Sequence, residues 1–466
     1  MDTREIINPQ KIDFLLAKST CNGANRVDGK KVSDILARAK TATGLELEEV
    51  AALIAAAPEF YSEILITAEE LRNRIYGNRI VLFAPLYWSN FCANRCHYCA
   101  FRVENKTNKR VRLTLEEVQK ETFALLDMGH KRTLIESGEH PRLNTMDYLT
   151  DVIRTIYSVV NSKGSRIRRV NVNIAATTVE NYRCLARAEI GTYNLFQETY
   201  HRPTYETAHP YGTLKGDYER QLFAMNRAIE GGLQDLGLGV LYGLYDWRFE
   251  VMAVISHAKY LDRTFGIGPH TISVPRICST EGVDFTPPYP VSDDDFLKLI
   301  AIIRLSVPYT GMVISTRETP EIRLKAFKAG ISQTSAGSKT SPGAYSMKAG
   351  SLNQFNLHDN RTLDEVTYEL LRNGLIPSHC TACECMNRMG TGFLPLAKSG
   401  EIKDYCFPNS LLTLKEYLRD YASEQTRKLG EQIIEQSLGG LFPKHRQIVE
   451  EWLKRLDKGD TTYLYL

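Results

Sequence analysis

The sequence predicts an α/β protein built on a (βα)8 TIM barrel, with a helical lead-in before the barrel and a mostly helical region after it. Two observations predict this fold. Eight short apolar runs of strand length lie between residues 79 and 334, and amphipathic helical patterns alternate with them. The stretch before residue 79 carries only helical patterns. Eight alternating units have the size and rhythm of a TIM barrel, although a doubly wound open sheet uses the same alternation.

Residues 1–78 are expected to form a helical segment. Helices are predicted at 33–40, 47–56 and 61–76, with Ser33 as the N-cap of the first and Gly77 as the C-cap residue of the last. Cys21 stands alone in this segment, and we expect it to be a small buried hydrophobic residue rather than a ligand.

The barrel is expected to occupy residues 79–340. Its strands are predicted at 79–87, 133–136, 169–174, 193–197, 235–241, 271–274, 311–315 and 330–334. Its helices are predicted at 114–128, 147–162, 179–187, 216–230, 247–264, 293–307 and 320–329. TIM barrels carry their active sites at the C-terminal ends of their strands, so the loop after the first strand is expected at the barrel mouth.

Residues 341–466 are expected to form a C-terminal domain. The stretch from Ser338 to Phe355 is rich in Ser, Gly and Lys but lacks the GxxxxGK[ST] spacing of a phosphate-binding loop, so it is predicted to be a mobile surface loop. A helix is predicted at 363–373, and residues 412–456 are predicted to be helical again.

Composition and charge exclude several classes of protein. The 466 residues include 43% hydrophobic and 24% charged residues, as in ordinary soluble globular proteins. A net charge of +3 gives no strong attraction to nucleic acid or to a membrane surface. The N-terminus lacks a signal-peptide pattern, and no apolar run approaches the length of a membrane span. We therefore expect a cytoplasmic protein whose ten cysteines are ligands rather than disulfides.

Three cysteines directly after the first strand form the first chemical motif. Cys92, Cys96 and Cys99 have the spacing CxxxCxxC. Three thiolates can hold three irons of a cubic iron–sulfur cluster and leave the fourth iron open for chemistry. A zinc site or a disulfide pair is the alternative interpretation.

A second cysteine group lies near the C-terminus. Cys380 and Cys383 form a CxxC motif, and Cys406 follows after 22 residues. On its own the group is as compatible with a structural zinc site, completed by His379 or Cys385, as with a second iron–sulfur cluster.

Several stretches together resemble a known family. The CxxxCxxC spacing, with Tyr98 before the last cysteine, is similar to the signature of the radical S-adenosylmethionine (SAM) superfamily. The other stretches are QETYHRPTYE (197–206), GLGVLYGLYDW (237–247), PHTISVPR (269–276), STRE (315–318) and CTAC followed by Cys406. With them, nearly the whole chain resembles the HydG family of tyrosine lyases, which mature FeFe hydrogenases. The ThiH tyrosine lyases of thiamine synthesis share QETYHRPTY but are not expected to have the C-terminal cysteines.

The resemblance implies cofactors, a reaction and partners. The cofactors would be SAM and two 4Fe-4S clusters, one binding SAM and one auxiliary. In the family, a 5′-deoxyadenosyl radical made from SAM abstracts a hydrogen from L-tyrosine, and Cα–Cβ cleavage gives p-cresol and dehydroglycine. At the auxiliary cluster the fragment becomes carbon monoxide and cyanide bound to iron. Further partners would be a reductant such as ferredoxin or flavodoxin and hydrogenase maturation scaffold proteins. Such chemistry requires exclusion of water and a channel between the clusters.

The resemblance also assigns roles to residues around the barrel mouth. Cys92, Cys96 and Cys99 would bind the SAM cluster, and the C-terminal three the auxiliary cluster. Ser137, Gly138 and Glu139 match the superfamily's Gly-Gly-Glu element, which meets the amino group of SAM, with Ser in place of the first Gly. Glu198 and Arg202 are candidate SAM contacts, or simply a salt bridge with each other. Arg317, with Ser315 beside it, is suited to hold the tyrosine carboxylate, unless it pairs with Glu318.

His270 and three other cysteines complete the set of candidate residues. The family holds an additional mononuclear iron with a histidine in the context of His270, completed by a non-protein amino acid such as cysteine. Cys278 and Cys385 are expected to be buried thiols, or else signs of an altered auxiliary site. Cys184 is expected in the core.

Two other classes of function stay open. One is a different lyase, either ThiH-like or acting on tryptophan. The other is a non-catalytic carrier that delivers iron to a hydrogenase scaffold, and its sign would be tight iron binding without SAM turnover.

Overall fold

The structure is a computed structural model that describes residues 2–20, 27–347, 350–386 and 388–466. Cys21 lies outside the described residues, and so does the side chain of Cys385, so their predicted roles stay predictions. Within the described residues no single helix has both the length and the apolar composition needed to cross a bilayer; only the bent pair Leu47–Ile54 and Pro58–Tyr76 reaches them jointly.

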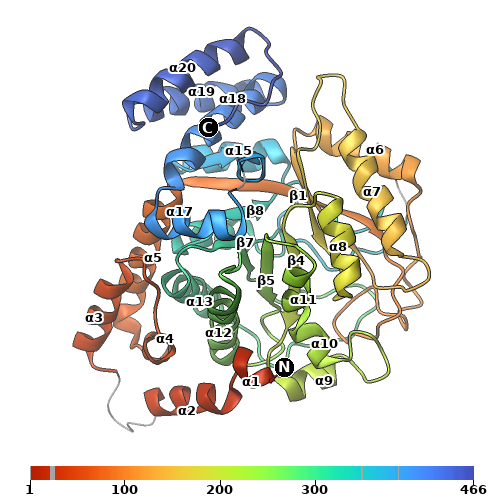
Figure 1. Ribbon diagram of the computed structural model, residues 1–466, viewed down its shortest axis with the longest axis vertical. Coiled ribbons are helices and arrows are strands. Elements are labelled where there is room, and N and C mark those ends of the chain that lie inside the picture. Colours follow the sequence, from red (N-terminus) through yellow and green to blue (C-terminus); the bar gives the residue numbers. More distant parts are fainter. Residues whose placement is uncertain (1, 21–26, 348–349, 387) are drawn as a thin grey trace.

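Eight parallel strands close into a barrel (Figure 1). They are β1 (Arg79–Ser89), β2 (Arg132–Ser137), β3 (Arg169–Asn173), β4 (Tyr193–Glu198), β5 (Leu236–Val240), β6 (Thr271–Ser273), β7 (Gly311–Ile314) and β8 (Gln333–Ser335). Each strand pairs with the next, and β1 pairs with both β8 and β2, which closes the sheet. The predicted TIM barrel is therefore confirmed and the open sheet is excluded.

The strands follow from apolar sequence buried on two sides. Every residue of β1 is buried, because one face of the strand meets the barrel interior and the other meets surrounding helices. The outer layer is formed by α6 (Leu115–Asp127), α7 (Met146–Ser158), α8 (Val179–Arg187), α9 (Arg202–Ala208), α10 (Tyr218–Leu222), α11 (Ala224–Glu230), α12 (Trp247–Phe265), α13 (Asp293–Ser306) and α14 (Pro320–Ala329). The single helix predicted at 216–230 is wrong, because the chain breaks at Phe223 between α10 and α11.

The N-terminal segment is helical, as predicted, but one cap differs. It contains α1 (Thr3–Ile6), α2 (Pro9–Thr20), α3 (Gly29–Ala39), α4 (Leu47–Ile54), the short η1 (Pro58–Phe60) and α5 (Tyr61–Tyr76). Asp28 caps α3 by accepting a hydrogen bond from the backbone N–H of Lys30, so the predicted N-cap Ser33 lies inside the helix. Helix α5 ends at Gly77, whose φ of 69° suits a glycine C-cap.

The C-terminal region adds a ninth strand to the sheet. It contains α15 (Leu363–Arg372), β9 (Ile376–Ser378), α16 (Ala382–Cys385), η2 (Gly390–Gly392), α17 (Phe393–Ser399), α18 (Lys403–Asp420), α19 (Glu424–Leu438) and α20 (Pro443–Asp457). Strand β9 pairs in parallel with Arg79–Val81, the N-terminal end of β1. Helices α15, α18, α19 and α20 gather at one edge of the molecule (Figure 1). This region therefore joins the barrel at the end opposite its mouth.

The stretch after β8 is not the predicted surface loop. Ser338, Thr340 and Ser341 are buried. The Tyr345 hydroxyl donates to the carbonyl oxygen of Pro85 at 2.9 Å, which ties this stretch to β1. Burial of so polar a stretch is compensated by such hydrogen bonds. The described part of the stretch therefore packs against the barrel mouth.

Candidate functional site

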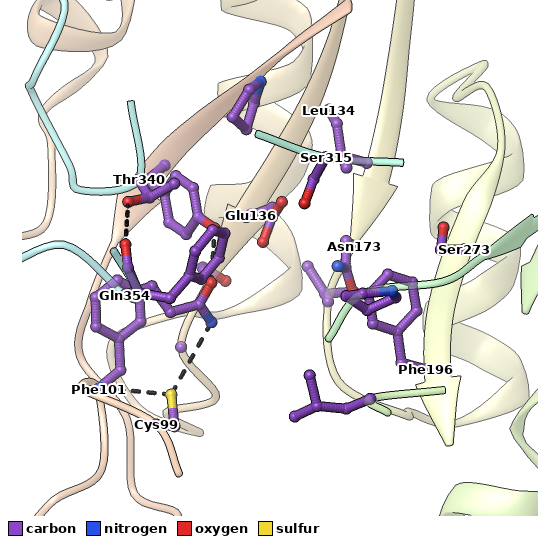
Figure 2. A pocket seen from close by; sticks show the side chains of 18 of the residues that line it. Cys99, Phe101, Leu134, Glu136, Asn173, Phe196, Ser273, Ser315, Thr340 and Gln354 are labelled. Carbon is purple, nitrogen blue, oxygen red and sulfur yellow. Dashed lines mark hydrogen bonds between the residues drawn. The ribbon is translucent and has the colours of Figure 1, made fainter. Parts of the chain in front are cut away.

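A cavity lies at the C-terminal ends of the barrel strands, and its space together with the open solvent at its mouth amounts to about 1420 Å³. Figure 2 shows that its wall combines side chains from β2, β3, β4 and β6 with the loops that follow β1, β7 and β8. This is the end at which TIM barrels carry their active sites. The three cysteines of the first motif and six of the other predicted site residues line it: Cys92, Cys96, Cys99, Ser137, Gly138, Glu139, Glu198, Ser315 and Arg317.

The three cysteines of the first motif face this cavity from the loop after β1. Backbone N–H groups donate to two of the sulfurs, from Asn94 to Cys92 and from Phe101 to Cys99, each at 3.4 Å. Burial raises the pKa of all three thiols, that of Cys96 well above its usual value. Buried thiolates next to one another require a positive charge to stabilise them, and an iron–sulfur cluster supplies it. The three cysteines therefore fit a cluster with one iron left open.

The end of β2 supports this loop and leaves no room for a side chain at Gly138. A Cβ at Gly138 would lie 2.5 Å from the carbonyl oxygen of Phe91 and 2.8 Å from the Cβ of Cys92. The Gly138 N–H donates to the Ser89 carbonyl at 3.0 Å, and the Ala93 N–H donates to the Glu139 carbonyl at 2.7 Å. The cysteine loop and the end of β2 are thus packed as one unit.

Two carboxylates on the cavity wall are held by cations that the sequence did not single out. Glu139 accepts hydrogen bonds from Asn94 Nδ2 at 2.6 Å and from Arg220 Nη2 at 2.9 Å. Glu198 accepts a hydrogen bond from Lys215 Nζ at 2.6 Å. Burial acts against the Lys215 charge, but Glu198 and nearby Cys96 outweigh it and raise the pKa of Lys215. Lys215 lies in the loop before α10, and Arg220 lies in α10. Neither belongs to a sequence motif, so only the folded structure shows that they pair with these carboxylates.

The backbone places Glu198 at the cavity by a local irregularity. The pairing of β4 with β5 shifts register between Phe196 and Glu198. Glu198 adopts a φ of 69°, a left-handed conformation that residues other than glycine seldom take. Bulges of this kind re-aim side chains at the rims of barrels.

Arg202 is not among the residues that line this cavity, and its predicted role as a SAM contact stays a prediction. Its guanidinium is half exposed and pairs with Glu206 at 2.9 Å and with Glu219 at 3.4 Å. The predicted alternative, a salt bridge with Glu198, is not formed, because Glu198 pairs with Lys215. Arg202 is the first residue of helix α9, and its side chain lies on the exposed side of that helix.

Arg317 lies on the opposite wall and keeps its charge unpaired. Its guanidinium stacks on the ring of Phe355 at 3.4 Å, and its backbone N–H donates to Ser315 Oγ at 3.4 Å. Glu318, the alternative partner, instead accepts two hydrogen bonds from Arg276 Nε at 3.0 and 3.2 Å. Within the described residues Arg317 forms no salt bridge. It can therefore receive a carboxylate group in the cavity.

The second cysteine group lies at the other end of the barrel, beside Arg79 at the start of β1. Cys383 and Cys406 contact each other, and the hydrogen bond from Cys383, reinforced by the Arg79 guanidinium, lowers the pKa of Cys406. Burial raises the pKa of Cys380, whose sulfur accepts a hydrogen bond from the Tyr463 hydroxyl at 3.7 Å. Cys380 follows β9, which pairs with Arg79–Val81, whereas Cys92 follows the other end of β1, so the two cysteine groups lie toward opposite ends of that strand.

The choice between a zinc site and a second iron–sulfur cluster at this end stays a prediction. In the part of the chain that the structure describes, no three His, Cys, Asp or Glu side chains gather closely enough to hold one metal ion. His379 stacks on Tyr417, and burial, together with the positive charges of nearby His130, Lys131 and Arg168, lowers its pKa.

His270 lies at the same end of the barrel as the second cysteine group. It directly precedes β6, its ring stacks on Phe393 with centroids 4.3 Å apart, and its Nδ1 lies 3.7 Å from Asp235 Oδ1. Cys278 lies in the loop after β6, half-buried, with its sulfur 3.7 Å from the Arg317 carbonyl oxygen. Cys184 lies in α8, where Arg187 donates to its sulfur at 3.1 Å; it is only partly buried, so the predicted core position is not reached.

Two family models and two sequenced enzymes match large parts of the chain. A family model described as the radical SAM superfamily matches residues 86–254, and one described as the biotin and thiamin synthesis associated domain matches residues 273–376. The 2-iminoacetate synthase of Salmonella typhimurium is 32% identical over 76% of this chain and 91% of its own length, and that of Escherichia coli is 31% identical over the same shares.

Solved structures match almost the whole chain. A crystal structure of HydG, described as a maturase of the [FeFe]-hydrogenase, is 47% identical, covers 99% of this chain and 100% of its own, and has a TM-score of 0.94. HydG from Carboxydothermus hydrogenoformans is 38% identical over 97% of this chain and 100% of its own, with a TM-score of 0.84.

Proposed function

The chain belongs to the radical SAM superfamily and, within it, to the family of HydG and the 2-iminoacetate synthases, and on this premise we propose the full course of its reaction. It is a radical SAM lyase that cleaves the Cα–Cβ bond of L-tyrosine to give p-cresol and dehydroglycine, also called 2-iminoacetate. The fragment is then converted at an auxiliary cluster to carbon monoxide and cyanide on iron, for assembly of a hydrogenase cofactor.

One observation carries the proposal for the first reaction. The three cysteines of the first motif and the unpaired Arg317 line the same cavity. When bound by Cys92, Cys96 and Cys99, a 4Fe-4S cluster with SAM supplies the radical that takes a hydrogen atom from the substrate. The protein's own contribution is to place tyrosine next to that radical and to exclude water from the cavity.

The other wall residues divide the binding of SAM and of tyrosine between them. Ser137, Gly138 and Glu139 offer backbone groups and a carboxylate to the amino group of SAM, and Glu198 offers a second carboxylate. On the opposite wall, Arg317 and Ser315 bind the carboxylate of tyrosine through charge-assisted hydrogen bonds.

The C-terminal region supports the HydG type over the ThiH type. The 2-iminoacetate synthases align with 76% of this chain, whereas the HydG structures cover 97% and 99%. Cys380, Cys383 and Cys406 would hold the auxiliary 4Fe-4S cluster, and His270, with a free cysteine, an additional iron. A reductant such as ferredoxin or flavodoxin and hydrogenase maturation scaffold proteins would be its partners.

Anaerobic reconstitution followed by product analysis tests this proposal. The protein with iron and sulfide should hold about eight irons per chain, the sum of two four-iron clusters. With SAM, tyrosine and dithionite it should form p-cresol and 5′-deoxyadenosine in step. Iron binding without either product would identify an iron carrier instead, and consumption of tryptophan in place of tyrosine would identify a different lyase.

A double variant separates the two halves of the reaction. Cys380→Ala with Cys383→Ala should retain p-cresol formation and lose carbon monoxide, because the first cavity lies at the other end of the barrel. Unchanged carbon monoxide output from this variant would refute a catalytic auxiliary cluster.

A further inference from the structure

Glu136 is a half-buried carboxyl group that lines the cavity, and the reaction above gives it no role. It lies near the C-terminal end of β2, in register with Tyr87 of β1 and Asn173 of β3. Figure 2 shows the Glu136 and Ser315 side chains both pointing into the cavity. Protein surrounds Glu136, and the surface that its side chain keeps accessible faces the cavity.

The groups around Glu136 compensate the negative charge of its carboxylate only in part. Burial raises its pKa to about 7, even though a hydrogen bond with Tyr87 and the attraction of Arg317 act in the opposite direction. Glu198 on β4 adds repulsion, and Tyr345, behind β1, is the other titratable group within its electrostatic reach. Glu136 forms no salt bridge within the described residues. A cationic ligand group would therefore be bound here with little competition from the protein.

An α-amino acid presents a carboxylate and an ammonium group on the same carbon atom. A site that binds tyrosine through Arg317 needs an acceptor for the ammonium group within a few ångströms of that arginine. Arg317 lies close enough to Glu136 for its positive charge to act against the rise in the pKa of Glu136. Glu198 and Glu139, the other carboxylates of the cavity, pair with Lys215 and Arg220 and are assigned to the amino group of SAM in the proposed function.

We propose that Glu136 binds the α-ammonium group of tyrosine and accepts one of its protons, while Arg317 and Ser315 hold the α-carboxylate. This inference rests on the proposed function. An N–H bond of the ammonium group breaks, its electron pair stays on nitrogen, and its proton forms an O–H bond on the Glu136 carboxylate. No oxidant or reductant takes part in this transfer.

The stoichiometry of the lyase reaction calls for such an acceptor. Tyrosine carries three hydrogens on its ammonium nitrogen, and dehydroglycine carries one on its imine nitrogen. One of the two that leave can go as the hydrogen atom taken in the radical step, so the other leaves as a proton. A carboxylate with a pKa near 7 is a stronger base than an ordinary glutamate and is still largely ionised just above neutral pH.

Glu136→Gln is the decisive variant, because the amide keeps the shape of the side chain but cannot take the proton. Iron content should equal that of the wild type. The yield of p-cresol per 5′-deoxyadenosine should fall at least about tenfold, since a positioned base typically contributes more than that. In the wild type, kcat/KM for p-cresol formation should rise with pH with a midpoint near 7, and in the variant this rise should disappear.

A binding measurement separates recognition from proton transfer. The competitor is 3-(4-hydroxyphenyl)propionate, which lacks the amino group of tyrosine. The wild type should prefer tyrosine over this acid, and Glu136→Gln should lose roughly tenfold of that preference, as expected for a charge-assisted hydrogen bond. Glu136→Asp, which keeps the charge, should retain both the preference and the pH dependence in part.

The possible outcomes distinguish this inference from the proposed function. If wild-type protein makes no p-cresol, the proposed function fails. If it makes p-cresol and Glu136→Gln matches its product ratio, pH profile and preference for tyrosine, Glu136 is not the ammonium site. If Glu136→Gln does not hold iron, the wild-type pH profile and the Glu136→Asp variant decide, and a profile that is flat around pH 7 overturns the inference.

Discussion

Gly138→Ala is expected to disable the first cluster site while leaving the second intact. The added Cβ would lie 2.5 Å from the carbonyl oxygen of Phe91 and 2.8 Å from the Cβ of Cys92. Ordinary contact begins at 3.4 Å, so the cysteine loop or the end of β2 must move by about 0.9 Å. Gly138 has no left-handed backbone conformation, so alanine adds no backbone strain and the steric contact is the whole effect.

The magnitude follows from the cost of overpacking. An extra carbon in a well-packed site typically costs about 1–3 kcal/mol. If that cost falls on the conformation of the loop that binds the cluster, its population drops roughly 5- to 150-fold, since each 1.4 kcal/mol is a factor of ten. Gly439→Ala is the matched control, because its Cβ would meet nothing closer than the Gln436 carbonyl oxygen at 3.9 Å.

Iron analysis, electron paramagnetic resonance and product formation measure the effect. In Gly138→Ala the iron content should fall from about eight per chain toward four, with loss of the signal that SAM perturbs and loss of p-cresol. The control should behave like the wild type. Wild-type iron content together with an unchanged p-cresol rate in Gly138→Ala would refute the close packing of the loop against β2.

Three further predictions follow from other contacts. Arg317→Lys should raise the KM for tyrosine by about 10- to 100-fold with a smaller change in kcat, because lysine cannot form two parallel hydrogen bonds to a carboxylate. An unchanged KM would show that the carboxylate of tyrosine binds elsewhere. Tyr463→Phe removes the hydroxyl group that donates to Cys380 Sγ at 3.7 Å. The auxiliary cluster should keep its iron, but a redox titration should show a reduction potential lower by some tens of millivolts. An unchanged potential would show that this contact does not act on the cluster. Burial raises the pKa of Glu250 to about 7, so the folded protein favours the protonated carboxyl group. This group stabilises the fold fully at pH values below the pKa of Glu250 in the unfolded chain, and the stabilisation is lost as the pH rises through 7. The melting temperature of the apoprotein should therefore fall between pH 5 and pH 8 in the wild type, by the equivalent of up to about 3 kcal/mol, and less in Glu250→Gln; parallel curves would contradict this.

The sequence predicted the barrel well because its strands are buried on two faces. Residues 79–87 read as a continuous apolar run, and β1 is buried at every position. The break at Phe223 was not predictable from helical periodicity, since both halves of the stretch keep the pattern of a helix. Strand β9 was missed because it has three residues, one of them Pro377, and exists only through its pairing with β1.

The candidate site was predictable where its residues are close in sequence. The spacing of Cys92, Cys96 and Cys99 alone indicates a metal cluster. No motif identifies Lys215 or Glu136, because their roles depend on partners that the barrel brings together from distant strands. The stretch around Phe355 was misread as a surface loop for the same reason: its polar residues are satisfied by contacts to β1 and to the cavity wall, which a local pattern does not contain.

The interior of the barrel bears on how a fragment could pass from one cysteine group to the other. TIM barrels usually fill their interior with branched aliphatic side chains. Here several buried positions along the strands are polar: Asn171, Asn194, Thr271, Gln333 and Ser335. Some of them are satisfied by the fold itself: Asn171 Oδ1 accepts a hydrogen bond from the Thr192 N–H at 3.1 Å, and Asn194 Oδ1 accepts one from Thr271 Oγ1 at 3.3 Å.

Under the proposed function, these groups would serve the transfer of a polar fragment. The proposed product, dehydroglycine, is an imine that hydrolyses in water, and the second cysteine group lies toward the opposite end of β1. A row of buried amide and hydroxyl groups can hydrogen-bond such a fragment without opening the path to solvent. An open sheet would expose the same row along its edges. Closure of the barrel by the pairing of β1 with β2 is therefore what would let the fragment travel between the two sites without being released.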